Sequence, residues 1–213
     1  MGKVQIIGAP QSSFVRTVRM VAEEKAIAYD LVAVGPHSPE IDAVHPLGKI
    51  PVMRHGEVTL FESKAIATYL DRVFPGPRMI PDEPIGCAKV EQWVSLINTN
   101  FGSVFGPYVG AYFFSKTPDG SLDRAAIDAV LAKVQTHLTL FDRAIAASGN
   151  LAGADFSLAD IYLLPILHYL NALPESGAMI AQAPALASYF ARHGARASVK
   201  ATIPPPLPKR AAA

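Results

Sequence analysis

Residues 45–71 read HPLGKIPVMRHGEVTLFESKAIATYLD, and this stretch decides the fold because it places a turn, two short strands and a helix in immediate succession. Proline and glycine among its first four residues predict the turn. His55 and Gly56 predict a tight turn between strands over 52–54 and 58–60. A helix is expected to begin at Glu62 and Ser63, because the apolar residues that follow recur at helical spacing. We therefore expect a strand pair that leads directly into a helix N-terminus.

The start of that helix has the chemistry of an amino-acid binding site. A helix N-terminus offers unpaired backbone N–H groups and a partial positive charge, which suit a carboxylate. Ser63 adds a hydroxyl group there, and Glu62 adds an anion suited to an ammonium group. An α-amino acid carries both groups on one carbon, so we expect this pair of residues to hold one.

The Ile50–Pro51 step is expected to bind the backbone of the same ligand. A residue before proline is steered away from the helical region, so the chain becomes extended at Ile50. If the bond is cis, the backbone of Ile50 turns outward and can pair with an extended peptide as one more strand. The implied ligand is a short peptide with a free amino-acid end. The structural alternative is that Pro51 is a trans proline at a strand edge and Ser63 an ordinary helix cap.

The runs LGKIPV and LFESKAIATYL together resemble the glutathione-binding half of the cytosolic glutathione S-transferases. The similar branch is the serine type, which includes the plant phi and tau classes and many bacterial relatives. The resemblance implies that Pro51 is cis and that Ile50 pairs with the cysteinyl backbone of glutathione. It also implies that Glu62 and Ser63 hold the γ-glutamyl end of glutathione, which is the co-substrate.

The residues before this stretch predict a β–α–β unit. Residues 3–8 and 29–34 are strand candidates, and a helix between them is expected to be capped by Ser12 or Ser13. The crossover is long enough for parallel pairing of the two strands. The order βαβ followed by ββα is the thioredoxin-like α/β plan, which the resemblance also implies.

A proline-rich segment, FPGPRMIPDEP at residues 74–84, separates two expected domains, because neither helix nor strand tolerates that density of proline. We expect a thioredoxin-like glutathione-binding domain over 1–75, a linker over 76–84, an all-helical (all-α) domain with the electrophile site over 85–202, and a mobile tail over 203–213. The helices expected in the second domain cover 85–115, 121–147, 157–171 and 185–197, with a shorter one over 174–181.

Ser157 and Asp160 predict a variant of the capping box at the start of one of these helices. The resemblance implies the same cap, in which the carboxylate is a folding element. We therefore assign Asp160 no catalytic role.

Composition argues against several classes of protein. The formal net charge is +1, and without a basic run this argues against nucleic acid as the main partner. No apolar stretch is long enough to cross a bilayer, and the N-terminus lacks the features of a signal peptide. The six histidines show no metal-ligand spacing, so no metal is expected. Cys87 is the one cysteine of the sequence, which fits a reducing cytoplasm and a cytoplasmic protein.

Two basic residues are candidates for binding the glycyl carboxylate of glutathione. His37 lies in a stretch similar to the His-x-Ser-Pro-Glu of phi-class relatives, with one residue missing here. Lys49 occupies the position where the family often has a glutamine or lysine that contacts this carboxylate. The alternatives are a solvated loop histidine and an exposed lysine without a ligand.

An aromatic stripe in the second domain is a candidate wall for the electrophile site. Its residues recur at helical spacing but are interrupted by glycines and Pro107, which should bend or break the helix. The resemblance implies that this helix leans over the sulfur of bound glutathione. The candidate lining residues are Phe14, Phe105, Tyr108 and Tyr112. The alternative is that the stripe belongs to the hydrophobic core.

Catalysis requires the glutathione thiol to lose its proton. A free thiol has a pKa of about 8.5, so only a small fraction is thiolate at neutral pH. The first helix offers a hydroxyl group at its N-terminus, where the helix dipole also favours negative charge. The resemblance places the catalytic residue at Ser12, with Ser13 as the alternative. The competing interpretation is that Ser12 only caps the helix, since capping and catalysis compete for one oxygen.

The predicted function is a glutathione transferase that activates the thiolate for attack on small hydrophobic electrophiles. A glutathione-dependent isomerase, lyase or ether-cleaving enzyme would use the same site. A glutathione-binding protein without turnover is the alternative from another class. The resemblance implies a homodimer, in which the first domain of one subunit packs on the helical domain of the other.

Overall fold

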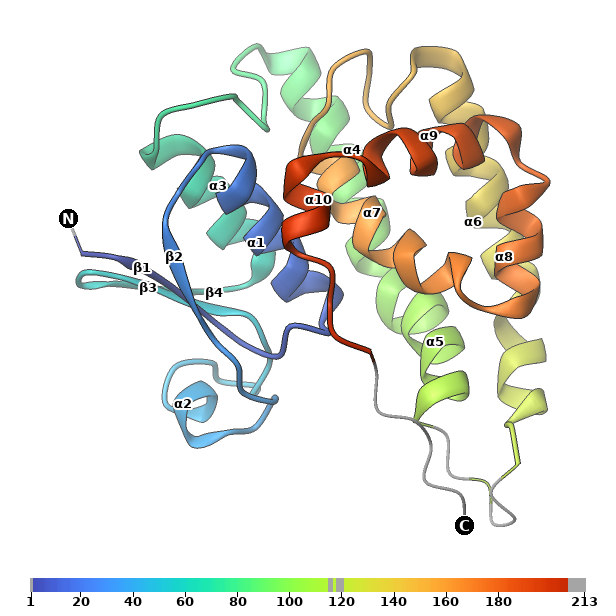
Figure 1. Cartoon of the computed structure of the whole chain (residues 1–213), viewed down its shortest axis with the longest axis horizontal. Coiled ribbons are helices and arrows are strands. Elements are labelled where there is room, and N and C mark those ends of the chain that lie inside the picture. The colour runs from blue at the N-terminus through green and yellow to red at the C-terminus, as the bar shows by residue number, and fades with distance from the viewer. Residues whose placement is uncertain (1, 115–116, 118–120, 207–213) are drawn as a thin grey trace. The chain divides into compact units, whose positions relative to one another are not determined.

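The computed structural model describes residues 2–114, 117 and 121–206 of the 213-residue chain. The chain divides into two compact units: the first comprises the residues up to Cys87 together with His193–Pro205, and the second comprises Ala88–Arg192. The first unit contains the sheet, and the second is built from helices (Figure 1). The fold is the predicted one, a thioredoxin-like α/β unit followed by a helical unit.

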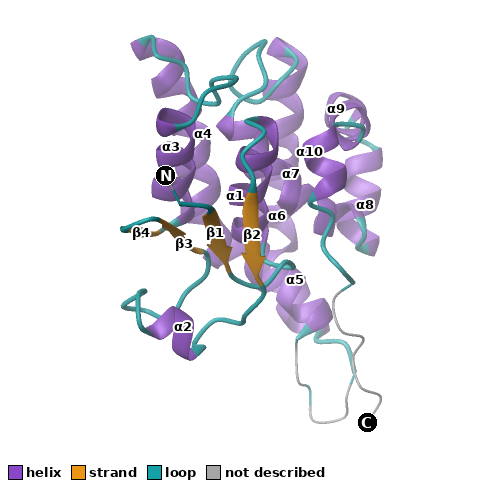
Figure 2. Cartoon of the chain, turned by 60° about the vertical axis from the view of Figure 1, so that its left-hand side comes forward, coloured by secondary structure: helices purple, strands orange, loops and turns teal. Residues whose placement is uncertain are grey.

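The sheet of the first unit has four strands in the order β2-β1-β3-β4 (Figure 2). The strands are β1 (Val4–Ile7), β2 (Tyr29–Val32), β3 (Val52–His55) and β4 (Val58–Phe61). β1 and β2 are parallel, as a crossover helix requires, whereas β3 is antiparallel to both β1 and β4. This is the predicted βαβ unit extended by the predicted hairpin.

Three helices accompany the sheet, namely α1 (Ser13–Glu24), α2 (Pro39–Asp42) and α3 (Ser63–Val73). α1 and α3 pack against each other and against strands of the sheet. Val15, Val18 and Ile66 are fully buried, as their helical spacing predicts. Ile41 of α2 packs with Ile7 and Val52 in a separate small cluster.

The C-terminal helix α10 (Ala197–Ala201) belongs to the first unit, although we expected residues up to 202 in the helical domain. Arg16 and Arg19 of α1 explain the difference, because their guanidinium groups donate to the carbonyl oxygens of Val199 and Ala201, at 3.2 Å each. These oxygens lie at the C-terminal end of α10, where a positive charge is stabilising. Contacts between residues this far apart in the sequence produce no local sequence pattern, so the position of α10 could not be predicted. The tail expected over 203–213 lies mostly outside the described residues, which end at Pro206.

The helical unit is formed by α4 (Pro84–Asn100), η1 (Phe101–Phe105), α5 (Gly106–Phe113), α6 (Arg124–Ser148), α7 (Leu158–Asn171), α8 (Pro174–Ala181) and α9 (Pro184–Gly194), with the ends of α4 and α9 in the first unit. The helix expected over 85–115 is therefore interrupted by η1, a π-helical turn. Pro107 accounts for the interruption, since it has no N–H to donate to the carbonyl four residues earlier.

The predicted capping box at the start of α7 is confirmed. The Asp160 carboxylate accepts from the backbone N–H groups of Ser157 (2.8 Å) and Leu151 (2.9 Å) and from the Tyr189 hydroxyl (2.9 Å). Burial raises the pKa of Asp160, while these hydrogen bonds oppose the rise. The carboxylate thus joins α7 to the preceding loop and to α9, which is a folding role.

Within residues 2–114, 117 and 121–206, no helix has the length and apolar character needed to span a membrane. The same residues contain no group of three or more His, Cys, Asp or Glu side chains that could hold a metal ion.

Candidate functional site

Four connecting segments meet at one end of the sheet. Ile7 pairs with Val32 on one side and with Val52 on the other, and Val52 pairs with Phe61. The segments that follow β1, β2 and β4 and the segment that precedes β3 therefore leave the sheet in one row, at strand spacings of about 4.8 Å. These segments carry Ser12, His37, Pro51 and Glu62. The sheet register thus brings together the predicted site residues of the first unit.

Ser12 is the N-cap residue of α1, as predicted. Its backbone is extended, with φ −66° and ψ 127°, and its Oγ accepts the Val15 N–H at 3.4 Å. That bond uses only a lone pair of the oxygen, so the hydroxyl proton can still be donated to another group. Capping and thiolate stabilisation therefore do not exclude each other, and the catalytic role of Ser12 stays a prediction.

Ser13 differs from Ser12 in burial and in position. It is the first residue inside α1 and is 9% exposed, whereas Ser12 is partly exposed. The Ser13 carbonyl accepts a hydrogen bond from Thr17 at 3.0 Å. Of the two hydroxyl groups, that of Ser12 is the more accessible to a ligand.

Gly8 allows the loop before α1 to approach the Ile50–Pro51 step. Its φ is +151°, and a Cβ built there would lie 2.6 Å from Cγ2 of Val15 and 3.0 Å from Cβ of Ile50. A side chain at position 8 would therefore separate α1 from Ile50. The Ile50–Pro51 peptide bond is cis, as predicted.

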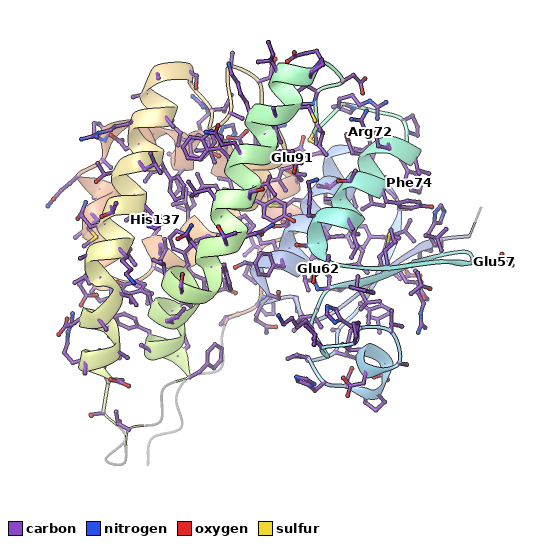
Figure 3. The ribbon with its side chains drawn as sticks, turned by 180° about the vertical axis from the view of Figure 1, so that it is seen from behind. Glu57, Glu62, Arg72, Phe74, Glu91 and His137 are labelled. Carbon is purple, nitrogen blue, oxygen red and sulfur yellow. The ribbon has the colours of Figure 1, made fainter. Side chains whose placement is uncertain are left out.

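Glu62 and Ser63 form the predicted start of α3. Glu62 has φ +67°, an uncommon value for a residue with a side chain, and its carbonyl accepts the Ile66 N–H at 3.0 Å. Its side chain is 66% exposed, while Ser63 is 7% exposed. Figure 3 labels Glu62 where the chain enters α3 and Glu57 at the far tip of the β3–β4 hairpin. An exposed carboxylate thus lies beside a helix N-terminus.

His45 is a residue of this region that the sequence reasoning missed. Its side chain is 3% exposed, and its Nε2 lies 3.7 Å from Oε1 of Glu62. Its Nδ1 accepts the Leu47 N–H at 3.0 Å. The available signal was a histidine directly before the proline of a turn, which by itself indicates no partner.

His37 and Lys49 are both exposed and are linked through Gly48. The His37 N–H donates to the Gly48 carbonyl at 2.9 Å, and the His37 ring lies where a Cβ of residue 48 would be. Gly48 has φ +60°, so glycine is favoured there for its backbone as well. His37 Nδ1 is 3.5 Å from Oδ1 of Asp42. Two basic side chains are therefore available on neighbouring loops.

The predicted electrophile residues differ in burial. Phe14 on α1 and Tyr112 on α5 are partly exposed, whereas Phe105 and Tyr108 are 1% and 0% exposed. The Tyr108 hydroxyl accepts the Ser176 N–H at 3.2 Å and lies 3.1 Å from Oε2 of Glu175. Phe105 and Tyr108 are thus core residues of the helical unit, the alternative left open for the stripe. A contact of Phe14 or Tyr112 with a substrate stays a prediction.

A charged cluster surrounds Tyr112. Its hydroxyl donates to Glu175, which also pairs with Arg124. Burial acts to raise the pKa of Glu175, but hydrogen bonds from Tyr112 and Arg124 outweigh it and lower the pKa to about 2. Burial and the bond to Glu175 raise the pKa of Tyr112, so its phenol is protonated at neutral pH. Tyr112 is therefore a neutral donor held by an anion.

Comparisons with known proteins agree in both units. A family model described as glutathione S-transferase, N-terminal domain, matches residues 6–78. A second, described as glutathione S-transferase, C-terminal domain, matches residues 124–192. The matched ranges contain most of the sheet with α1 and α3 in the first unit, and nearly all of α6 to α9 in the second.

Three relatives are similar to this chain over nearly their whole length. Glutathione S-transferase 3 of Zea mays is 28% identical over 220 residues, which covers 97% of this chain and 98% of that protein. A glutathione S-transferase structure from Methylobacillus flagellatus KT with GSH bound is 31% identical, with a TM-score of 0.79, covering 95% of this chain and 100% of that one. The theta class enzyme from Xanthomonas axonopodis pv. citri with glutathione bound is 28% identical, with a TM-score of 0.85, covering 98% and 100%.

Proposed function

Because this chain belongs to the glutathione S-transferase family and is a transferase, we propose that it activates bound glutathione as a thiolate and adds it to small hydrophobic electrophiles. The observation that carries this proposal is the sheet register, which aligns the ends of β1, β3 and β4 beside one another. A short extended peptide laid across these three ends would meet Ser12, the Ile50 backbone and Glu62 in turn.

The γ-glutamyl end of glutathione is proposed to bind at the start of α3. Its ammonium group would face the exposed carboxylate of Glu62, and its carboxylate would accept from Ser63 and the first N–H groups of the helix. The helix has 11 residues, long enough to present a dipole at its N-terminus. Two opposite charges of the ligand would then each have a partner.

The rest of the peptide is proposed to bind along the adjoining segments. The cysteinyl backbone would pair with Ile50, next to Pro51, in the manner of an added strand. The glycyl carboxylate would be bound by Lys49 and His37, which are exposed on loops joined through Gly48. Lys49 supplies a flexible cation, and the His37 ring supplies a hydrogen-bond donor.

Ser12 is proposed to stabilise the thiolate by donating its hydroxyl proton. The cap of α1 supports this role, because the Val15 N–H already occupies a lone pair of Oγ and orients the hydroxyl. The N-terminus of α1 adds a favourable dipole for a negative sulfur. A hydrogen bond to a charged group of this kind lowers the pKa of the thiol.

For the electrophile we propose a contact with Tyr112 of the helical unit, which is partly exposed. In the first unit, Phe14 is partly exposed as well, and we propose it as a separate contact. Phe105 and Tyr108 would support the helix that carries Tyr112, rather than contact the substrate. Aromatic contacts of this kind favour an apolar electrophile. We also propose a detoxification role and a cytoplasmic location. We further propose a homodimer, which the family resemblance implies, with Leu47, 62% exposed, as one candidate apolar contact.

The test measures binding and turnover with the same preparation. Isothermal titration with glutathione and with S-methylglutathione should show binding of both ligands, because the peptide rather than the sulfur supplies most contacts. Conjugation of glutathione to an activated aryl chloride should proceed faster than the uncatalysed reaction, and S-methylglutathione should inhibit it. Binding without conjugation of any electrophile would instead favour a binding protein. Absence of glutathione binding would overturn the proposal.

A further inference from the structure

A buried histidine beside Glu62 has a fixed orientation. His45 Nδ1 accepts the Leu47 N–H at 3.0 Å, so the proton of the neutral ring is on Nε2. The ring packs against Phe61, with 4.8 Å between the centroids. Nε2 is 3.7 Å from Oε1 of Glu62. This separation is longer than a direct hydrogen bond. The turn and the aromatic contact therefore place an N–H group beside one oxygen of the Glu62 carboxylate, close enough for a small rotation of the exposed Glu62 side chain to complete a hydrogen bond.

The Glu62 side chain has no bond to α3 that would fix its conformation. Its backbone has φ +67°, and its side chain is 66% exposed and makes no capping bond to α3. An exposed glutamate side chain has several rotamers, and binding a ligand would cost the entropy of fixing one of them. A buried neighbour that restricts those rotamers lowers this cost before the ligand arrives.

We infer that His45 is a positioning residue for Glu62, which holds Oε1 so that Oε2 is free to accept the ammonium group of the ligand's γ-glutamyl end. This inference rests on the proposed function. A ring N–H suits the role better than a lysine would, because a lysine would compete with the ammonium group for the carboxylate. The predicted specificity is for a free α-amino group at the end of the peptide.

Two substitutions distinguish the contact of His45 with Glu62 from its hydrogen bond to the Leu47 N–H in the turn. In His45→Asn, the side-chain oxygen lies near the position of Nδ1 and can still accept the Leu47 N–H, but no donor reaches Glu62. In His45→Gln, the longer amide places a donor near the position of Nε2. We therefore expect His45→Gln to keep the function that His45→Asn loses.

The measurement is the preference for glutathione over its desamino analogue, which lacks only the α-amino group. By isothermal titration, His45→Asn should reduce this preference about fivefold, the range of one hydrogen bond, with the affinity for the analogue nearly unchanged. His45→Gln should retain most of the preference. In steady-state assays His45→Asn should raise KM for glutathione and leave kcat at saturation nearly unchanged. In a Glu62→Gln background, His45→Asn should have no further effect on the preference.

The matched control is His55→Asn, which removes another buried histidine of the same unit. His55 is 5% exposed and bonds to the Tyr69 hydroxyl at 2.8 Å, so its loss should lower the melting temperature without changing the preference. Equal weakening of both ligands in His45→Asn would show that His45 acts only on the turn and would overturn the inference. An unchanged preference in His45→Asn would overturn it as well, while the proposed function would stand. If the wild-type protein did not bind glutathione, both would fall.

Discussion

Lys25 and Asp71 form an ion pair whose side chains are both completely buried, with Nζ 3.4 Å from Oδ1. The same carboxylate accepts the N–H groups of Met79 (2.8 Å) and Ile80 (3.3 Å), and Lys25 donates to the Pro77 carbonyl at 3.0 Å. The pair therefore joins the end of α1, the end of α3 and the proline-rich segment after it. The proline-rich segment, which we expected as a linker, is therefore fixed to α3 at Met79 and Ile80, which are buried.

Replacing one partner of this pair should strongly destabilise the protein. Lys25→Met leaves a buried carboxylate without its counter-ion, so we expect a loss of about 3–5 kcal/mol in the free energy of unfolding. Urea denaturation provides the measurement. The control is Lys3→Met, whose pair with Asp30 is 57% and 50% exposed and should contribute no more than about 1 kcal/mol. Similar losses in the two variants would contradict the assigned role of the buried pair.

Ser12→Ala should raise the pKa of bound glutathione by roughly one to two units, because a charge-assisted hydrogen bond is lost. Conjugation near neutral pH should fall accordingly, while the affinity for glutathione changes little. A pH titration of the ultraviolet absorbance of the bound thiolate measures the shift. Ser13→Ala is the matched control and should change the pKa less. A shift confined to Ser13→Ala would move the role to that residue.

Glu62→Ala and Ser63→Ala should each weaken glutathione binding about tenfold or more, because the first removes the partner of the ligand's ammonium group and the second removes a hydrogen-bond donor to its charged carboxylate. Isothermal titration checks this directly. Glu57→Ala removes another exposed glutamate from the same hairpin, at the tip opposite Glu62 (Figure 3), and should have no effect on affinity. Unchanged affinity in both site variants would place the amino-acid end elsewhere.

Glu175 should make the stability of the helical unit depend on pH in the acid range. Its pKa is lowered to about 2 in the folded chain, so its contribution to stability is complete above its unfolded pKa of about 4.3 and is lost as pH falls toward 2. The difference in unfolding free energy between wild type and Glu175→Gln should therefore be largest near neutral pH and shrink below about pH 4. Asp128→Asn, which changes a 58% exposed partner of Arg124, is the control. A difference that is independent of pH would contradict the lowered pKa.

Much of the fold was predictable because its signals are local. The hairpin and α3 follow from turn residues and helical spacing within one short stretch. The cap of α1 at Ser12 and the capping box at Ser157 and Asp160 involve partners only three residues apart. The positions of Ser12, Glu62 and Ser63 at helix N-termini were predictable for the same reason, whereas the catalytic role of Ser12 was implied by the family resemblance and stays a prediction.

The sequence by itself thus determined the order of strands and helices, the helix caps and the candidate site residues, because these depend on neighbours along the chain. The tertiary structure alone decided the partners that are distant in sequence. Arg16 meets Val199 across 183 positions, and His45 reaches Glu62 only because the turn before β3 lies beside the end of β4. The identity of a charged or polar side chain does not indicate which distant residue will be its partner, because many residues could form an equivalent hydrogen bond or ion pair. The partner is decided by how the helices and strands pack in the folded chain.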